Sequence, residues 1–137
     1  MKITNFDLVG IGNILEQFGN YKLPQRISYA ITKNGMILKK DYSVYEAELK
    51  KILNQYSEYM IKDENGNYIT GDLGIPLVEP KYKDEFNEVM SELLNIEIDV
   101  DFYHIDSSLF EYDDSDKYDA LSPKDIITLQ SILCEEV

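Results

Sequence analysis

The feature that most constrains the fold is a run of apolar residues at helical spacing within residues 24–60. Pro24 suits the first turn of a helix, and apolar side chains then recur three or four positions apart. The repeat consists of Ile27, Ile31, Leu38, Tyr42, Tyr45, Leu49, Ile52, Tyr56 and Met60. It predicts one long amphipathic helix, in which residues 42–60 are the best-supported part.

Asn34-Gly35 lies inside this repeat and is the strongest short hairpin signal that a sequence can carry. Residues 27–31 before it and 36–38 after it could pair as strands. The helical spacing continues across the dipeptide, however, and the flanks are not rich in β-branched residues. We therefore expect a helix here, and a break or kink near Gly35 stays open.

Shorter elements surround the long helix. Thr4 and Asp7 resemble a capping box, and Ser122 with Asp125 does so again around a first-turn proline. The other expected elements are a helix over 5–18, a hairpin pairing 59–61 with 68–70, a loop over 71–80, a helix over 82–95, an exposed acidic loop over 113–116 and a helix over 122–133.

The clearest strand covers residues 96–103, because apolar and polar side chains alternate strictly there. Its apolar positions are Ile96, Ile98, Val100 and Phe102, and its polar positions are Glu97, Asp99, Asp101 and Tyr103. One face should be buried and the other acidic. The sequence thus predicts an α+β fold: a mainly helical small single domain over 1–137, with a β-hairpin and one acidic-faced strand.

Charge divides the chain into a near-neutral helical part, 1–62, and an acidic α+β half, 63–137. The first part has nine basic and six acidic residues, for a net charge of +3, and the second has four and twenty, for −16. A nucleic-acid ligand is disfavoured, because binding to phosphates depends on Lys and Arg. The expected partner is a basic protein surface, and the alternative is that the acidity only keeps the protein in solution.

Several classes are excluded or disfavoured. No window approaches the roughly 18 apolar residues of a membrane span, and the first residues lack the layout of a signal peptide, so we expect a cytoplasmic protein with no membrane contact. Cys134 is the single cysteine, which excludes an intramolecular disulfide and a cysteine-rich zinc site. The spacing of Asp63, Asn65 and Asn67 is like that of a calcium loop, but Tyr68 and Gly74 stand where its glycine and closing glutamate belong.

Catalytic patterns are equally weak. His104 lies near Asp106, Ser107 and Ser108, but no glycine-flanked nucleophile turn or oxyanion-hole motif accompanies them. Phosphate-binding glycine loops are absent from the sequence. Glu97, Asp99 and Asp101 are too far apart along one strand face to chelate one ion together, although two of them with a third group could. We expect no enzyme activity, no cofactor and no metal.

The acidic strand face and the residues after it form the candidate partner-binding surface. Their row of negative charges resembles the charge density of one nucleic-acid strand and could occupy a groove that holds DNA or RNA. Interleaved tyrosines are typical anchors of protein interfaces. The candidate contacts are Glu97, Asp99, Asp101, Tyr103, Asp106, Tyr112, Asp113, Asp114 and Asp116. The alternative is the ordinary solvated face of an edge strand, whose charges prevent aggregation.

The order of several segments resembles a family of small proteins of unknown function encoded by phages and prophages of low-GC Gram-positive bacteria. The similar segments are 3–5, 22–24, 27–31, 33–34, 45–46, 63–68 and 92–100, which together span nearly the whole chain. The resemblance implies a phage origin and favours a helix across Gly35. It specifies no chemistry and no catalytic residue.

These inferences lead to one main functional hypothesis. It is a non-enzymatic, anti-CRISPR-like phage protein that binds a basic nucleic-acid-binding groove of a host defence protein and inhibits it, acting in the host cytoplasm as a nucleic-acid mimic. The alternative is a phage tail or head assembly factor that uses the helix over 42–60 against a partner helix.

Overall fold

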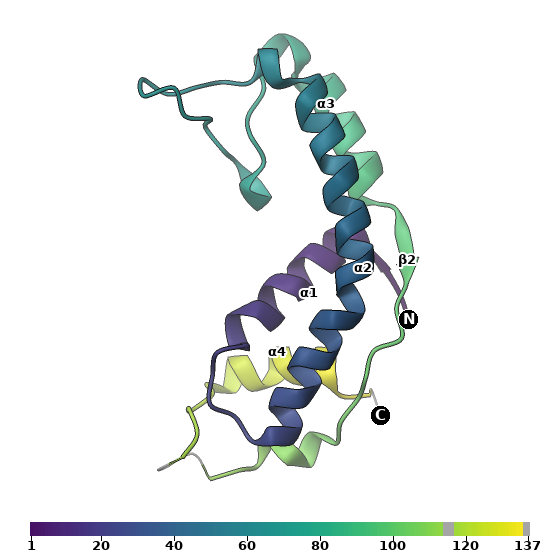
Figure 1. The fold of residues 1–137 in the computed structure, drawn as a ribbon, viewed down its shortest axis with the longest axis vertical. Helices are drawn as coiled ribbons and strands as arrows, with labels where there is room; N and C mark the ends of the chain where they lie inside the picture. The colour runs from purple at the N-terminus through teal and green to yellow at the C-terminus, as the bar shows by residue number, and fades with distance from the viewer. Residues whose placement is uncertain (114–116, 136–137) are drawn as a thin grey trace. The chain divides into compact units, whose positions relative to one another are not determined.

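Residues 1–113 and 117–135, which the computed structural model describes, form four α-helices and one two-stranded antiparallel sheet (Figure 1). The fold is mainly helical and belongs to the α+β class, as the sequence predicts. The chain divides into two compact units, one formed by Met1–Tyr42 with Glu97–Val137 and the other by Ser43–Ile96. No helix in the described part of the chain is both long and apolar enough to cross a membrane.

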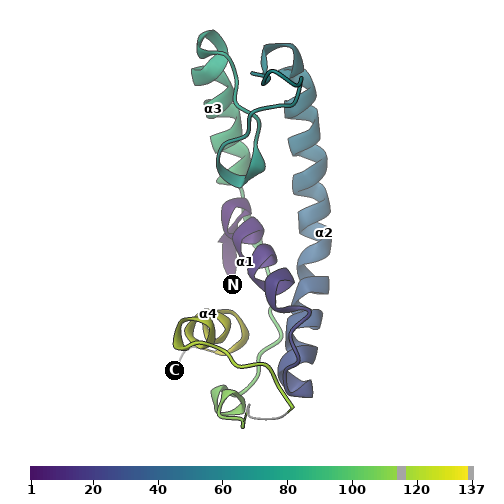
Figure 2. The ribbon, with the colours of Figure 1, turned by 90° about the vertical axis from the view of Figure 1, so that its left-hand side faces the viewer.

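The first unit contains the sheet and three helical segments. Its elements are β1 (Lys2–Thr4), α1 (Asn5–Phe18), the N-terminal part of α2 (Gln25–Gln55), β2 (Glu97–Asp99), a 3-10 turn (Ser107–Phe110) and α4 (Pro123–Leu133). Leu8 of α1, Ile27 of α2, and Leu129 and Leu133 of α4 are fully buried. Figures 1 and 2 show α1 and α4 beside the N-terminal part of α2, so these helices enclose the core of the unit.

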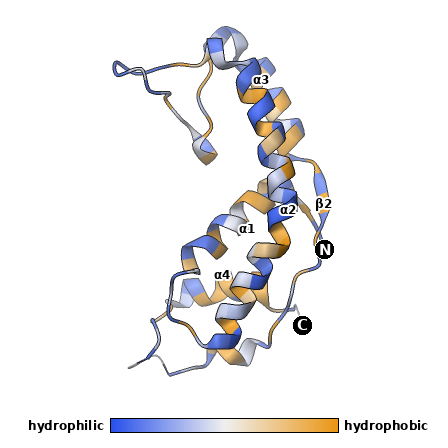
Figure 3. Cartoon of the chain, viewed as in Figure 1, coloured by the Kyte–Doolittle hydropathy of each residue, from blue (hydrophilic) through white to orange (hydrophobic). Residues whose placement is uncertain are grey.

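The second unit contains the C-terminal part of α2, two 3-10 turns (Ser57–Tyr59 and Asp72–Gly74) and α3 (Pro80–Leu94). Tyr56, which follows α2, packs edge to face on Phe86 of α3 with ring centroids 5.2 Å apart. Figure 3 shows hydrophobic and hydrophilic positions alternating along α2 and α3, as expected for helices with one buried side.

The ends of three helices follow from local signals. Both capping boxes are formed, by Thr4 with Asp7 at α1 and by Ser122 with Asp125 at α4. Pro80 occupies the first turn of α3, so that helix begins two residues before the expected position. The helices expected over 5–18, 82–95 and 122–133 are therefore confirmed, with small shifts at their ends.

Helix α2 is continuous from Gln25 to Gln55, so the hairpin alternative at Asn34-Gly35 is wrong. Gly35 does not adopt the positive φ that a two-residue hairpin turn would require. The helix also ends before Met60, which pairs with Val78 in an isolated bridge. One expected core position is wrong as well, since Tyr42 is 38% exposed.

Residues 60–78 form three short extended segments. The Ile61 N–H donates to the Leu77 carbonyl (2.9 Å), the Leu77 N–H to the Ile69 carbonyl (2.8 Å) and the Ile69 N–H to the Ile61 carbonyl (3.0 Å). The expected hairpin between 59–61 and 68–70 is present, supported by the Lys62–Tyr68 bridge. The third segment lies in the stretch expected to be a plain loop, because its Gly and Pro residues conceal the pairing.

The expected strand over 96–103 is regular only at Glu97–Asp99. Its partner β1 was not predicted, because three residues are too few to show a repeat. From Ile98 onward the burial pattern agrees with the alternation, since Val100 and Phe102 are buried while Asp99 and Asp101 are exposed. The expectation that Ile96 lies on the buried face is wrong, because its side chain is 51% exposed.

Candidate protein-binding surface

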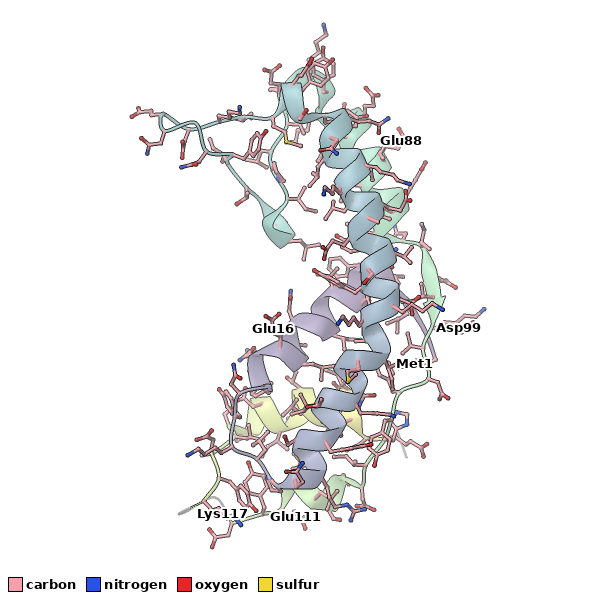
Figure 4. The ribbon with its side chains drawn as sticks, viewed as in Figure 1. Met1, Glu16, Glu88, Asp99, Glu111 and Lys117 are labelled. Atoms are coloured by element: carbon pink, nitrogen blue, oxygen red, sulfur yellow. The ribbon has the colours of Figure 1, made fainter. Side chains whose placement is uncertain are left out.

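Two strands fix the start of the acidic row, which we define as Glu97, Asp99 and Asp101. In the antiparallel register, Lys2 lies opposite Asp99 and Thr4 lies opposite Glu97. The Val100 N–H donates to the Met1 carbonyl at 2.9 Å and extends the pairing by one residue. The three carboxylates of the row are exposed, because the intervening residues face the core. Figure 4 shows Asp99 on this outer side of β2.

Asn34 of α2 holds the far end of the row. Its side chain is completely buried, and its amide pairs with the backbone of Tyr103. The Tyr103 N–H donates to Asn34 Oδ1 at 2.8 Å, while Asn34 Nδ2 donates to the Tyr103 carbonyl at 2.9 Å. The Asn34 side-chain amide thus pairs with the Tyr103 backbone as a neighbouring strand would. Its carbonyl oxygen and its NH₂ group both have hydrogen-bond partners.

The Tyr103 side chain points away from this anchor and remains 39% exposed. Its ring contacts that of Tyr29, which is 50% exposed, with centroids 5.5 Å apart and an interplanar angle of 68°. Edge-to-face packing of two half-exposed rings places a rigid apolar surface at the end of the acidic row.

The acidic row has little compensating charge nearby. None of its three side chains forms a hydrogen bond or an ion pair with a residue in 1–113 or 117–135. Lys2 is the cross-strand neighbour of Asp99 and lies beyond ion-pair distance. Carboxylates on a paired backbone segment that have no partner in the described part of their own chain are available to cations of a partner protein.

The remaining candidate contacts form a second group after the row. Asp106 caps the 3-10 turn and accepts the Ser108 N–H at 2.8 Å. Hydrogen bonding from the Ser108 side chain and backbone, with a smaller contribution from the positive charge of Arg26, lowers the pKa of Asp106 below its usual value. Asp106 is therefore an ionised and oriented carboxylate at neutral pH.

Tyr112 and Asp113 follow the 3-10 turn. Tyr112 donates its hydroxyl to the Asp119 carbonyl at 2.9 Å and packs edge to face on Tyr118 at 5.5 Å. It thus orders its own loop, and its side chain is only half-exposed. Asp113 is exposed, and the expected contacts Asp114 and Asp116 lie outside the described residues.

The residues around His104 do not assemble a catalytic triad. Nδ1 of His104 is 3.6 Å from Oε1 of Glu135, an exposed carboxylate, and Asp106 is bonded to Ser108. The base thus lacks the buried orienting acid that such a triad uses.

No group of three or more His, Cys, Asp or Glu side chains within 1–113 and 117–135 is placed to hold a metal ion. In the loop that is like a calcium site, Asp63 Oδ1 accepts the N–H groups of Asn65 (2.9 Å) and Asn67 (3.0 Å). This carboxylate oxygen orders the turn itself.

Sequence reasoning missed Asn34 and Tyr29 as parts of this surface. One signal for Asn34 was present: a polar residue stands in line with Ile27, Ile31 and Leu38, where a core position is expected. A buried amide needs a partner, which could have been sought in the rest of the chain. No local signal places Tyr29 beside Tyr103, because their contact depends on the tertiary fold.

Comparisons of this chain with protein-family models, with curated proteins and with solved structures find no match.

Proposed function

We propose that this chain is a non-enzymatic inhibitor encoded by a phage or prophage, which binds a basic nucleic-acid-binding groove of a host defence protein in the manner of an anti-CRISPR protein. The acidic row is the centre of the contact, and Tyr103 with Tyr29 supplies an apolar anchor beside it. Bound there, the protein excludes DNA or RNA from the groove.

The observation that carries the proposal is the backbone pairing of the acidic row, whose side chains have no hydrogen-bond or ion-pair partner within residues 1–113 and 117–135. The row is anchored by β1 at one end and by Asn34 at the other. Because the backbone is fixed before binding, the partner does not have to order these carboxylates. An unpaired charge that is already in position increases both association rate and specificity for a basic surface.

The spacing of the carboxylates limits how closely the acidic row can imitate the charge of a nucleic-acid strand. Alternate residues of a strand are about 6.6 Å apart, whereas one DNA strand carries a phosphate about every 3.4 Å along the axis. The row alone thus has about half the axial charge of a nucleic-acid strand. The proposal therefore includes Asp106 and Asp113 as further contacts, together with Asp114 and Asp116.

The assembly-factor alternative required the apolar side of the helix over 42–60. Tyr45, Ile52 and Tyr56 on that side are buried by other parts of the same chain. Side chains already covered by their own chain are not exposed to a partner helix, which favours the inhibitor proposal.

The proposal is tested by affinity purification of the tagged full chain from bacterial host cells, with the retained proteins identified by mass spectrometry. We expect a nucleic-acid-binding host protein that is released by raised salt and displaced by a DNA or RNA duplex. Recovery of only capsid, portal or tail components would contradict the proposal. So would a partner that binds this protein and its nucleic acid at the same time.

A further inference from the structure

The second unit carries an exposed apolar cluster on the extended segments of residues 60–78. Ile69, Leu73 and Leu77 are 39%, 41% and 43% exposed, and we call these three residues the apolar tip. They belong to a hairpin whose turn is the 3-10 segment Asp72–Gly74. Aliphatic side chains with this much accessible surface offer an apolar contact that their own chain leaves open.

Backbone pairing places two members of the apolar tip side by side. The Leu77 N–H donates to the Ile69 carbonyl at 2.8 Å, and the Thr70–Pro76 bridge sets the register in which these two residues are directly opposite. Their side chains therefore share one face of the hairpin. The Leu77 side chain extends from there toward the turn, because a Cβ added to Gly71 would lie 3.0 Å from Leu77 Cδ2. The apolar side chains thus lie around one turn and are not scattered over the surface.

Leu73 is an unfavourable residue for the centre of this turn. Its φ of 58° lies in the left-handed region, which asparagine and glycine adopt more readily than leucine. Because its side chain is 41% exposed, packing within the chain offsets only part of this backbone cost. A strained residue that presents an exposed apolar side chain is typical of a contact site.

The charge around the apolar tip indicates the kind of partner. Residues 60–79 carry one basic side chain, Lys62, and four acidic ones, Asp63, Glu64, Asp72 and Glu79. The whole second unit has eleven acidic and five basic residues, for a net charge of −6. An anionic membrane surface would repel this unit, and two copies of the chain, each with a net charge of −13, would repel one another. A basic protein surface that contains an apolar pocket is complementary to the tip.

We propose that the apolar tip is a second contact with the basic host protein of the proposed function. Leu73 enters an apolar pocket of that protein, and Lys or Arg side chains beside the pocket lie opposite Asp72. This inference rests on the proposed function, but it assigns a surface in a different unit from the acidic row. The row supplies charge, whereas the tip supplies apolar contact that salt does not screen.

The test measures the affinity of full-chain variants for the recovered nucleic-acid-binding host protein, by titration at several salt concentrations. Leu73→Asn removes the apolar side chain and introduces a residue that tolerates the left-handed conformation. Ile69→Thr is a second variant, since a β-branched residue suits an extended segment. Ile127→Gln is the matched control, because it removes an apolar side chain that is 68% exposed on α4.

We expect Leu73→Asn and Ile69→Thr each to weaken binding about tenfold at every salt concentration, because an apolar contact is lost while the charges are unchanged. The slope of affinity against salt should remain that of the wild type. Ile127→Gln should bind as the wild type does. Leu73→Asn should unfold at the wild-type temperature or above, so weakened binding could not be attributed to misfolding.

Three results would overturn the inference. They are wild-type affinity of both tip variants, an equal loss of affinity in Ile127→Gln, and a self-association of the wild type that Leu73→Asn abolishes. The last would show that the tip binds a second copy of this chain.

Neutralising the acidic row in the same titration distinguishes this inference from the proposed function. If the row variant binds as the wild type does while the tip variants bind weakly, the acidic row is not the contact and the tip is. If only the row variant binds weakly, the inference about the tip fails alone. Recovery of no nucleic-acid-binding host protein would contradict both.

Discussion

The side-chain amide of Asn34 binds the backbone of Tyr103 through both of its polar groups, at 2.8 and 2.9 Å. This pair joins a helix near the start of the chain to an extended segment far along it. It also explains why Asn34-Gly35 does not form a turn, because the asparagine is committed to a tertiary contact. The acidic row thus depends on a residue that carries no charge.

Substitution Asn34→Ala should lower the free energy of unfolding by about 1–3 kcal/mol, because the Tyr103 N–H and carbonyl lose their partners. Hydrogen exchange of the Tyr103 amide should accelerate at the same time. Urea unfolding and amide exchange measure the two effects. Asn54→Ala, at an exposed position of α2, is the matched control and should change stability by no more than about 0.5 kcal/mol. Equal effects of the two substitutions would refute the anchoring role.

Asp106 should make stability depend on pH in the acidic range. Its pKa is lower in the folded protein than in the unfolded chain, where it is about 3.9, so its ionised form stabilises the fold at neutral pH. That contribution is lost as the pH falls through the folded pKa. Asp106→Asn, which can still cap the turn, should therefore be less stable than the wild type at pH 7, and the difference should shrink below about pH 4. Urea unfolding of the wild type and of the variant between these pH values measures the difference, and a difference that does not change with pH would contradict the role of Asp106.

Leu73 adopts a left-handed conformation, with φ 58° and ψ 19°, directly before Gly74 with φ 69°. The Ile75 N–H donates to the Asp72 carbonyl at 3.2 Å, so two residues with positive φ form the centre of a tight turn. Leu73→Asn creates the Asn-Gly pair that such turns prefer and should raise the free energy of unfolding by about 1 kcal/mol. Leu73→Ala should give no comparable gain. A loss of stability in Leu73→Asn would contradict this prediction. It would show that packing of the leucine side chain, which is 41% exposed, stabilises the fold by more than the left-handed backbone conformation of Leu73 destabilises it.

Lys2 faces Asp99 across the sheet and reduces the negative potential of the acidic row. Lys2→Gln should increase the rate of association with a basic partner about two- to threefold at low salt, because one positive charge that repels the partner and offsets the acidic row is removed. The gain should vanish as salt is raised. Lys83→Gln, which changes the net charge equally on exposed α3, is the control. Equal association rates of the two variants would show that the net charge of the protein, and not the charge near the acidic row, determines the association rate.

Local signals predicted much of the fold, because caps and apolar repeats act within a few residues. The Thr4–Asp7 and Ser122–Asp125 boxes place two helix starts, and strict alternation predicts which side of residues 97–102 is buried. What could not be predicted depends on pairs distant in sequence. Strand β1 exists only through its pairing with β2, and no periodicity reveals it.

The same division holds for the candidate surface. Exposure of Asp99 and Asp101 follows from alternation alone, whereas the anchoring of Tyr103 by Asn34 and its contact with Tyr29 follow from the packing of α2 on a distant segment. The extent of α2 was predicted too long, because apolar spacing continues to Met60 after the helix has ended at Gln55. Residues 56–60 keep the spacing while belonging to a turn and an isolated bridge.

The most direct test of the central claim compares two triple variants that lose the same charge at different places. One is Glu97→Gln with Asp99→Asn and Asp101→Asn, and the other is Asp84→Asn with Glu88→Gln and Glu92→Gln on exposed positions of α3. Affinity for the recovered nucleic-acid-binding partner is measured by titration at several salt concentrations. We predict that the first variant binds at least about tenfold more weakly with a flatter salt dependence, while the second binds nearly as the wild type does. Equal affinities of the two variants would contradict the claim that the acidic row is the binding surface.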